Sequence, residues 1–417
     1  MEMWRGVVLV FCALGVLPGL QALAADTLNL AVMPVSAAQR EAINELAARY
    51  NSRGTHRVLV VAYPHEMFKA RIETLLSDAG QDLDVVVWFG GERLRRLIRN
   101  GLIQPLDALS DQLNPDHFTK SALTTVRYGD QVWGVPVSYY PWGIFYRKSV
   151  FRKLGLAPPE DGAQLNQVIR ALRQAGHTPF ALGSEAPWTL LAWFDYLDLR
   201  LNGKAFHEQL TAGQIPFTDD RVRRVFRQWA DWLAEGLYPR NHGAMDWRSA
   251  LPYYYRKLAP MMLMGQFVLV EIPQAIREDS GFLPFPDLNP EVPRAEDAPT
   301  DILIMPARAP HREAALDFLR FMAEPEQQAY LNAQYGTFSP LRAVPPPEDR
   351  VRAQGHAILA QASELTQFFD RDAPAELAEG MLAMVQAFVR EPEALETQLQ
   401  TLERVRRNLR QPTPSAD

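Results

Sequence analysis

Residues 128–159 read YGDQVWGVPVSYYPWGIFYRKSVFRKLGLAPP, two extended segments separated by a cluster of aromatic residues. The first segment, residues 131–138, is rich in Val and is interrupted by a glycine and a proline. The second, residues 143–146, is a short apolar strand followed by a basic helical turn that ends at Gly155. The four residues between them, 139–142, are large or rigid, and consecutive side chains of a strand cannot all point inward. We therefore predict that these aromatic residues line a cleft between two lobes.

Strands alternate with helices on the N-terminal side of this stretch, which is typical of an α/β lobe with a largely parallel sheet. Ligands of such sheets bind beyond the carboxyl ends of the strands. Residues 34–36, 64–66 and 88–92 should therefore share one rim. The predicted strands are residues 27–35, 57–63 and 83–88, and the helices after the second and third strands are residues 66–76 and 92–99.

The C-terminal side of the stretch is predicted to begin a second lobe in which helices predominate. Its helix over residues 219–236 is amphipathic, so we assign Trp229 and Trp232, which share the apolar stripe, to the core. The proline-dense residues 284–310 should return across the hinge. The other predicted elements are helices at residues 165–175, 187–202, 311–323 and 325–335 and strands at residues 178–182, 258–272 and 301–305.

Length, charge and the N-terminal segment restrict the class of protein. A chain of 417 residues is too long for one compact core, and a net charge of -6 without a basic stripe argues against a nucleic-acid partner. Residues 1–24 have the basic start, apolar run and Ala-Leu-Ala end of a cleavable signal peptide. The single cysteine, Cys12, follows Phe11, whereas a lipoprotein site requires a small residue there. We therefore expect a periplasmic protein without a disulfide or a lipid anchor.

Several segments, taken in order, resemble a known family. WGVP at residues 133–136, FYRK at residues 145–148 and GLAPP at residues 155–159 resemble the periplasmic solute-binding proteins of ABC importers, in particular the group that includes maltodextrin-binding protein. The resemblance extends from about residue 28 to residue 340. Its other landmarks include DLDVVVWFGGERLRRLIRNGLIQPL at residues 82–106, LMGQFVL at residues 263–269 and EAALDFLRFMAEPEQQAYLNAQYGTFSP at residues 313–340.

The resemblance implies a bilobal α/β fold in which two α/β lobes are joined by a multi-strand hinge. The first lobe would comprise residues 25–137 and 300–337. The second lobe would comprise residues 138–299 and 338–411, and residues 412–417 are expected to form a disordered tail.

The resemblance also indicates ligand-binding residues. Glu92 and Arg93 match an acidic–basic pair that contacts sugar hydroxyls, and Trp88 matches if one extra residue is allowed before it. The alternative is that Trp88 packs beneath the helix that follows and that Glu92 caps this helix. Tyr140 stands where the relative has a ligand-contacting glutamate, which disfavours maltodextrin itself as the ligand. Phe267 matches a stacking tryptophan, with a place in the core as its alternative.

Further candidates lie beside the predicted cleft. Aromatic planes stack on the C–H faces of sugar rings, and polar side chains such as those of Asp and Gln bind the hydroxyl rims. Packing at the hinge is the alternative for Tyr139, Tyr140 and Trp142. The candidates are Ser36, His65, Tyr139, Trp142, Trp188, Trp193, Asp195, Gln266 and Phe338.

Other classes of function have weak support. The sequence lacks a P-loop, a G-x-S-x-G elbow and an H-E-x-x-H pair. Paired carboxylates for glycoside hydrolysis have no sequence signature, because their separation is spatial. A ferric-ion binder would use tyrosine clusters such as Tyr139-Tyr140 or Tyr253-Tyr254-Tyr255, but these lack His or Asp neighbours at ligand-like spacing. We predict no catalytic, cofactor or metal site.

The combined prediction is a monomeric periplasmic component of an ABC importer that captures a small solute, a mono- or oligosaccharide. The lobes should close around the solute by hinge motion, and the closed form should dock on the transmembrane permease subunits. The alternative is a ligand-sensing subunit for a membrane histidine kinase or a chemoreceptor, which would share this fold.

Overall fold

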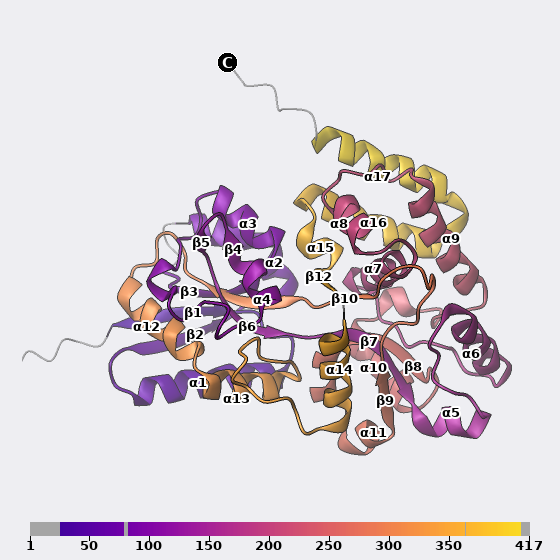
Figure 1. Cartoon of the computed structure of the whole chain (residues 1–417), viewed down its shortest axis with the longest axis horizontal. Coiled ribbons are helices and arrows are strands. Elements are labelled where there is room, and N and C mark those ends of the chain that lie inside the picture. The colour runs from indigo at the N-terminus through magenta and orange to yellow at the C-terminus, as the bar shows by residue number, and fades with distance from the viewer. Residues whose placement is uncertain (1–25, 79–81, 363, 410–417) are drawn as a thin grey trace, which may run out of the picture.

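The computed structural model describes residues 26–78, 82–362 and 364–409. The chain forms two lobes that lie side by side, each with its own sheet and its own helices (Figure 1). The predicted bilobal α/β fold is therefore confirmed. The predicted signal peptide, residues 1–24, and the predicted tail, residues 412–417, lie outside the described residues.

The first lobe is built around a five-stranded mixed sheet with the order β2-β1-β3-β11-β6. Strand β1 pairs in parallel with β2 and β3, as the alternation of strands and helices predicts. Strand β11 returns from the second lobe and runs antiparallel to both β3 and β6. The strands are β1 (Thr27–Val32), β2 (Arg57–Ala62), β3 (Val85–Phe89), β6 (Val135–Tyr139) and β11 (Thr300–Ile304).

Amphipathic helices complete the first lobe. In α1 (Ala37–Ser52) the buried residues Ile43, Leu46, Ala47 and Tyr50 recur at helical spacing. The other helices are α2 (His65–Ser77), α3 (Glu92–Arg99), α4 (Lys120–Val126), α12 (Arg312–Met322), α13 (Pro325–Tyr335) and the 3-10 helix Asp107–Leu109, and the short strands β4 (Arg127–Tyr128) and β5 (Gln131–Val132) pair with each other.

The second lobe has a three-stranded antiparallel sheet with the order β8-β7-β9. Its strands are β7 (Trp142–Arg147), β8 (Met261–Gly265) and β9 (Ser280–Leu283). Two short strands, β10 (Ala295–Asp297) and β12 (Glu364–Thr366), pair in parallel beside it. The helices are α5 (Lys148–Leu154), α6 (Gly162–Gln174), α7 (Trp188–Asn202), α8 (Lys204–Thr211), α9 (Asp220–Ala234), α10 (Trp247–Tyr255), α11 (Gln274–Glu278), α14 (Arg350–Gln361), α15 (Phe369–Asp372), α16 (Ala375–Arg390) and α17 (Leu395–Leu409), with 3-10 helices at His242–Ala244, Gln266–Val270 and Pro392–Ala394.

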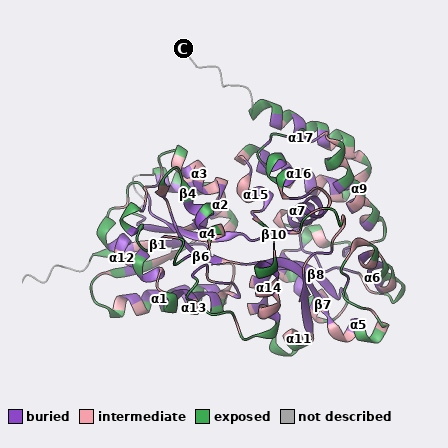
Figure 2. Cartoon of the chain, in the orientation of Figure 1, coloured by how far each residue is buried: buried purple, intermediate pink, exposed green. Residues whose placement is uncertain are grey.

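Helix α7 lies inside the second lobe, where residues 189–200 are all buried (Figure 2). A helix that is apolar on most of its surface is expected in such a central position. The predicted placement of Trp229 and Trp232 in the core is confirmed, because both are buried in the same cluster as α7.

Two predicted strands of the second lobe are shorter than expected. Residues 178–182 make only an isolated bridge, between Phe180 and Met261, because the neighbouring Pro179 has no N–H to extend a ladder. The predicted strand over residues 258–272 ends at Gly265, where the chain turns into the 3-10 helix Gln266–Val270.

The chain crosses between the lobes where β6 passes into β7, where β10 passes into β11, and again near Phe338. At these crossings the backbones of Tyr139 and Phe338 exchange two hydrogen bonds of 2.9 Å. We propose that the lobes meet at the predicted boundaries, except that Leu341 packs into the core of the first lobe rather than the second.

Gly143 tests the packing of the central strand β7. A Cβ atom at this position would lie 2.6 Å from the carbonyl oxygen of Leu283 and 2.7 Å from the ring of Phe282. Replacing Gly143 with Ala should therefore lower the free energy of unfolding by about 1–3 kcal/mol, as measured by urea denaturation. Gly243→Ala is the matched control, because a Cβ there meets no atom within 4 Å. Equal stability of the two variants would contradict this packing.

Candidate functional site

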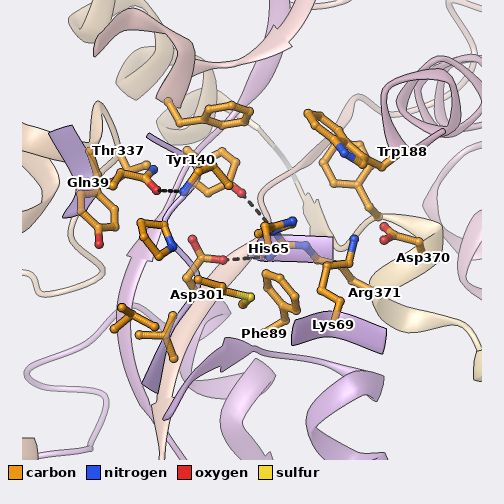
Figure 3. A pocket seen from close by; sticks show the side chains of 18 of the residues that line it. Gln39, His65, Lys69, Phe89, Tyr140, Trp188, Asp301, Thr337, Asp370 and Arg371 are labelled. Atoms are coloured by element: carbon orange, nitrogen blue, oxygen red, sulfur yellow. Dashed lines mark hydrogen bonds and ion pairs between the residues drawn. The ribbon is translucent and has the colours of Figure 1, made fainter. Parts of the chain in front are cut away.

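A cavity lies between the two lobes and is lined by residues from both (Figure 3). It encloses about 1030 Å³ of space outside the protein atoms, part of which is open to solvent. Its lining comprises Val32, Met33, Pro34, Val35, Gln39, His65, Lys69, Val87, Phe89, Tyr140, Trp142, Trp188, Trp247, Phe267, Asp301, Tyr335, Thr337, Phe368, Asp370 and Arg371.

Aromatic rings from the second lobe form one wall of the cavity. Phe267, at the start of the 3-10 helix after β8, is the centre of this wall. Its ring centroid lies 5.4 Å from Tyr140, 5.7 Å from Trp247 and 6.1 Å from Trp142, all in edge-to-face geometry. Trp188, at the first turn of α7, packs edge-on against Trp142 at 5.8 Å and is only half-buried. Such a wall offers flat apolar faces to a ligand.

Gly265 allows these rings to come together. A Cβ atom at this position would lie 2.6 Å from the ring of Phe267 and 2.8 Å from Nε1 of Trp142. The presence of glycine at the end of β8 is therefore explained by its surroundings, because any side chain there would displace the rings of the aromatic wall.

A charged group also lines the cavity. Nη1 of Arg371 lies 3.1 Å from Oδ1 of Asp301, and Nη2 donates a hydrogen bond of 3.1 Å to the hydroxyl of Tyr140 (Figure 3). The guanidinium also lies over the ring of Phe89, 4.2 Å from its centroid. Arg371 comes from α15 and Asp301 from β11, so this ion pair joins the two lobes.

The neighbours of Arg371 on α15 also contact the first lobe. Arg93 donates to the carbonyl oxygen of Asp370 at 2.8 Å and lies 3.2 Å from its carboxylate. The carboxylate of Asp372 accepts a hydrogen bond of 2.9 Å from the backbone N–H of Glu92. This short helix therefore bridges the lobes beside the cavity.

Lys69 of α2 adds a buried cation to the lining. Its side chain is 13% exposed and lies 3.3 Å from Glu66. Burial lowers the pKa of Lys69, although the negative charges of Asp370 and Glu66 oppose this shift. Burial likewise raises the pKa of Tyr140, whose hydroxyl stays neutral at physiological pH.

The structure brings a part of the predicted site residues together in the cavity. Tyr140 and Trp142 come from the crossing strands, whereas Trp188 and Phe267 come from the second lobe. His65 lies on the first-lobe rim, at the start of α2, with Nδ1 2.8 Å from Glu66. The residues of the three predicted rim segments that line the cavity are Pro34, Val35, His65 and Phe89.

The structure places Trp88 in the core and not in the cavity. Side chains alternate along β3, so Val87 and Phe89 face the cavity while Trp88 points to the other face of the sheet. Trp88 is 2% exposed and packs against Phe68. The prediction thus missed the cavity by one residue along the strand.

Glu92 and Arg93 do not line the cavity but contact α15, which does. The carboxylate of Glu92 pairs with Arg95 and Arg99 on the same helix. Arg93 holds Asp370, which does line the cavity. These two predicted residues are therefore placed beside the lining, in contact with α15.

The remaining predicted residues serve the scaffold in this structure. Ser36 caps α1 by accepting a hydrogen bond of 3.1 Å from the N–H of Gln39. Tyr139 and Phe338 pack against each other between the lobes, with ring centroids 6.3 Å apart. The buried Gln266 side chain donates to the carbonyl oxygen of Val351 at 2.7 Å.

Trp193 and Asp195 of α7 lie in the interior of the second lobe. Trp193 is 1% exposed and packs edge-on against Phe180 at 4.7 Å. Asp195 has no exposed surface and accepts a hydrogen bond of 3.2 Å from the backbone N–H of Phe369 on α15.

Sequence reasoning missed Asp301 and the lining residues of α15. The segment FFDRD at residues 368–372 combines aromatic and charged residues, which is the composition of a polar-ligand site. This signal was overlooked because the family resemblance weakens beyond residue 340. Asp301 opens a predicted strand, but its alternation does not reveal that its side chain faces a cavity.

Among the residues that the structure describes, His, Cys, Asp and Glu side chains form no group of three or more that could hold a metal ion. None of the helices between residues 26 and 409 that the structure describes is long and apolar enough to cross a membrane.

The buried charge of Lys69 can be tested by substitution. Lys69→Met should raise the free energy of unfolding by about 1 kcal/mol or more at pH 7, because it removes a poorly solvated cation. A lysine whose pKa is lowered in the folded state gains stability as the pH rises, so the advantage of the variant should shrink towards pH 10.5. Urea denaturation between pH 7 and 10 measures both effects. The exposed Lys153→Met is the control, and the same pH trend in both variants would contradict the assignment.

Solved structures of known proteins share this fold. The bacterial solute receptor AcbH, described as having an exclusive preference for β-D-galactopyranose, aligns with a TM-score of 0.85 and 25% identity over 92% of this chain and 98% of AcbH. Maltose-bound MalE3 of T. maritima aligns with a TM-score of 0.76 over 92% of this chain and 100% of that chain. At 15% identity, the second likeness concerns the fold alone.

Sequence comparisons agree with the fold. An uncharacterised ABC transporter extracellular-binding protein of Pyrococcus horikoshii is 26% identical over 277 residues, 65% of this chain and 60% of that protein. The multiple sugar-binding protein of Streptococcus mutans is 24% identical over 213 residues, 50% of this chain and 51% of that protein. The matches thus span about half to three-fifths of these relatives. The family described as "Bacterial extracellular solute-binding protein" matches residues 36–329. The chain belongs to this family of bacterial extracellular solute-binding proteins.

Proposed function

We propose that this protein is the solute-binding component of an ABC importer and that it captures a mono- or oligosaccharide in the cavity between its lobes. The observation that carries the proposal is the composition of the cavity. An aromatic wall around Phe267 and Trp188 faces the charged pair of Arg371 and Asp301.

This arrangement suits the two kinds of surface on a sugar ring. The C–H face of the ring stacks on aromatic planes such as that of the half-buried Trp188. The hydroxyl rim needs both donors and acceptors, which the guanidinium of Arg371 and the carboxylates of Asp301 and Asp370 supply. The preference described for AcbH and the similarity to the multiple sugar-binding protein of Streptococcus mutans support the same class of ligand.

Binding is proposed to occur without chemistry, through closure of the lobes. Lining residues come from both lobes, so a bound ligand would contact both and favour the closed arrangement. We further propose that the exported, monomeric protein presents this closed form to the permease subunits.

A panel of ligands tests the proposed class. Thermal unfolding of the mature protein should be measured with D-galactose, maltose, raffinose, amino acids and ferric ion. A ligand at a hundred times its dissociation constant adds about 2.7 kcal/mol to the stability of the folded state. A rise in Tm with a sugar would support the proposal. A rise with only amino acids or ferric ion would reject the sugar and keep a binding protein.

Trp188 tests the stacking wall. Trp188→Ala should weaken the binding of the sugar that stabilises the protein by about ten-fold or more, because it removes a ring face from the cavity. Isothermal titration calorimetry measures the change. Trp88→Phe is the matched control, since Trp88 is buried outside the cavity and its variant should keep the affinity. Loss of affinity in the control alone would overturn the placement of the site.

A further inference from the structure

On the side away from the cavity, α15 contacts a buried group of ionisable side chains in the second lobe. Asp195 of α7 accepts a hydrogen bond of 3.2 Å from the backbone N–H of Phe369, the first residue of α15. Asp195 and Phe369 have no exposed surface. The cavity residues Asp370 and Arg371 follow directly after this anchor point.

His207 of α8 lies between two carboxylates of α7. Its Nδ1 is 2.9 Å from Oδ2 of Asp198, and its Nε2 is 3.9 Å from Oδ1 of Asp195. The three side chains are at most 1% exposed. Oδ1 of Asp195 and Nε2 of His207 have no hydrogen-bond partner among the described residues, so these two atoms face each other mainly through their charges.

A second connection reaches α15 through the chain that precedes it. The hydroxyl of Thr366, in β12, donates a hydrogen bond to the carboxylate of Asp297 in the paired strand β10. Asp297 is fully buried, and its negative charge acts on His207. Both the strand before α15 and the first residue of α15 are thus tied to one cluster, which comprises Asp195, Asp198, His207 and Asp297.

Other polar and charged groups lie around this cluster, including Arg221 of α9, which interacts with the charge of Asp198. Arg200 of α7 pairs with the buried Glu296 of β10 at 2.6 Å, and Asn202 donates to Asp198 at 2.7 Å. The charge of Asp370 on α15 also acts on Asp195. His207 is therefore a cation placed among carboxylates of α7 and β10.

We propose that the cluster of Asp195, Asp198, His207 and Asp297 fixes α15 in the position from which it closes the cavity, and that His207 is a positioning residue for ligand binding. The proposal concerns a contact behind the cavity and rests on the proposed sugar-binding function for its effect on affinity. His207 does not line the cavity, so its effect is transmitted through Asp195 and the Phe369 amide.

The cluster should depend on pH. Burial lowers the pKa of His207, but the hydrogen bond to Asp198 and the charges of Asp195, Asp198 and Asp297 outweigh it and raise the pKa to about 9. Its stabilising charge is thus fully present below pH 6.5 and is lost as the pH rises through 9. Burial raises the pKa of Asp195 and Asp297, and the positive charge of His207 opposes this shift in both carboxyl groups.

Hydrogen exchange in the ligand-free full chain tests the anchoring without any sugar. In His207→Gln, the amides of residues 364–372 should exchange about ten-fold faster than in the wild type, because Asp195 loses the facing cation. His177→Gln is the matched control, since His177 is a half-buried histidine of the same lobe that contacts the carbonyl of Lys257. Unchanged exchange at residues 364–372, or faster exchange spread evenly over the second lobe, would overturn the proposal.

A second pair of variants distinguishes loss of the anchoring hydrogen bond from a general folding defect. Asp195→Asn keeps an oxygen that can accept from the Phe369 amide, whereas Asp195→Ala removes it. The Asn variant should keep more of the protection of α15 than the Ala variant, although it loses the charge that faces His207. Equal protection in the two variants would contradict the anchor.

Affinity provides the functional readout. With D-galactose as the probe, calorimetry should give about ten-fold weaker binding for His207→Gln at pH 6.5 and little further loss at pH 9, whereas the wild type weakens towards pH 9. A parallel pH profile in the two proteins would overturn the role of His207. If the wild type does not bind D-galactose, that choice of sugar fails, while the exchange at α15 still decides the role of the cluster.

Discussion

The ion pair between Arg371 and Asp301 joins a helix of the second lobe to the sheet of the first lobe at the cavity. Arg371 belongs to α15, and Phe369, the first residue of this helix, packs in the core of the second lobe. Asp301 lies on a strand of the first-lobe sheet. The guanidinium is held on three sides, by Asp301, by the Tyr140 hydroxyl and by the face of Phe89. A planar fork fixed in this way can still direct its remaining N–H groups at a ligand. Separation of the lobes would break this contact together with those of Asp370 and Asp372, so α15 connects the lining of the cavity to the contact between the lobes.

The aromatic wall depends on backbone features that are easily overlooked. The β8 strand ends at Gly265, and the absence of a Cβ there lets Trp142 and Phe267 approach each other. The bend in the chain then directs Phe267 into the cavity, whereas its neighbour Gln266 points inward and binds the backbone of α14. Two consecutive residues thus have opposite roles, one in the cavity and one in the scaffold. Every ring in the wall packs edge-on against at least one other ring of the wall.

The bilobal fold and the aromatic crossing could be predicted from the sequence, because hydrophobic periodicity and the order of family landmarks both report on them. The orientation of single side chains could not. Trp88 and Phe89 are adjacent, and a shift of one residue decides which of them faces the cavity. Arg371 was missed for a different reason, since contacts between residues 70 positions apart leave no periodic trace in the sequence. Asp195 was assigned to the ligand, yet its side chain is directed at the backbone of α15.

The buried carboxylates of Asp84 in the first lobe and of Asp195 and Asp297 in the second lobe differ in whether each oxygen has a hydrogen-bond partner. In the first lobe, Asp84 accepts hydrogen bonds from the backbone N–H groups of Asn29 at 2.8 Å and His311 at 2.7 Å, as expected of a structural carboxylate. In the second lobe, Asp195 and Asp297 each keep an oxygen without a partner among the described residues. Apolar residues of similar size would often be neutral or more stabilising at such positions. A cluster with unpaired carboxylate oxygens is therefore not explained by stability alone. Because Asp195 contacts the first residue of α15, the cluster is instead related to the position of this helix, which lines the cavity.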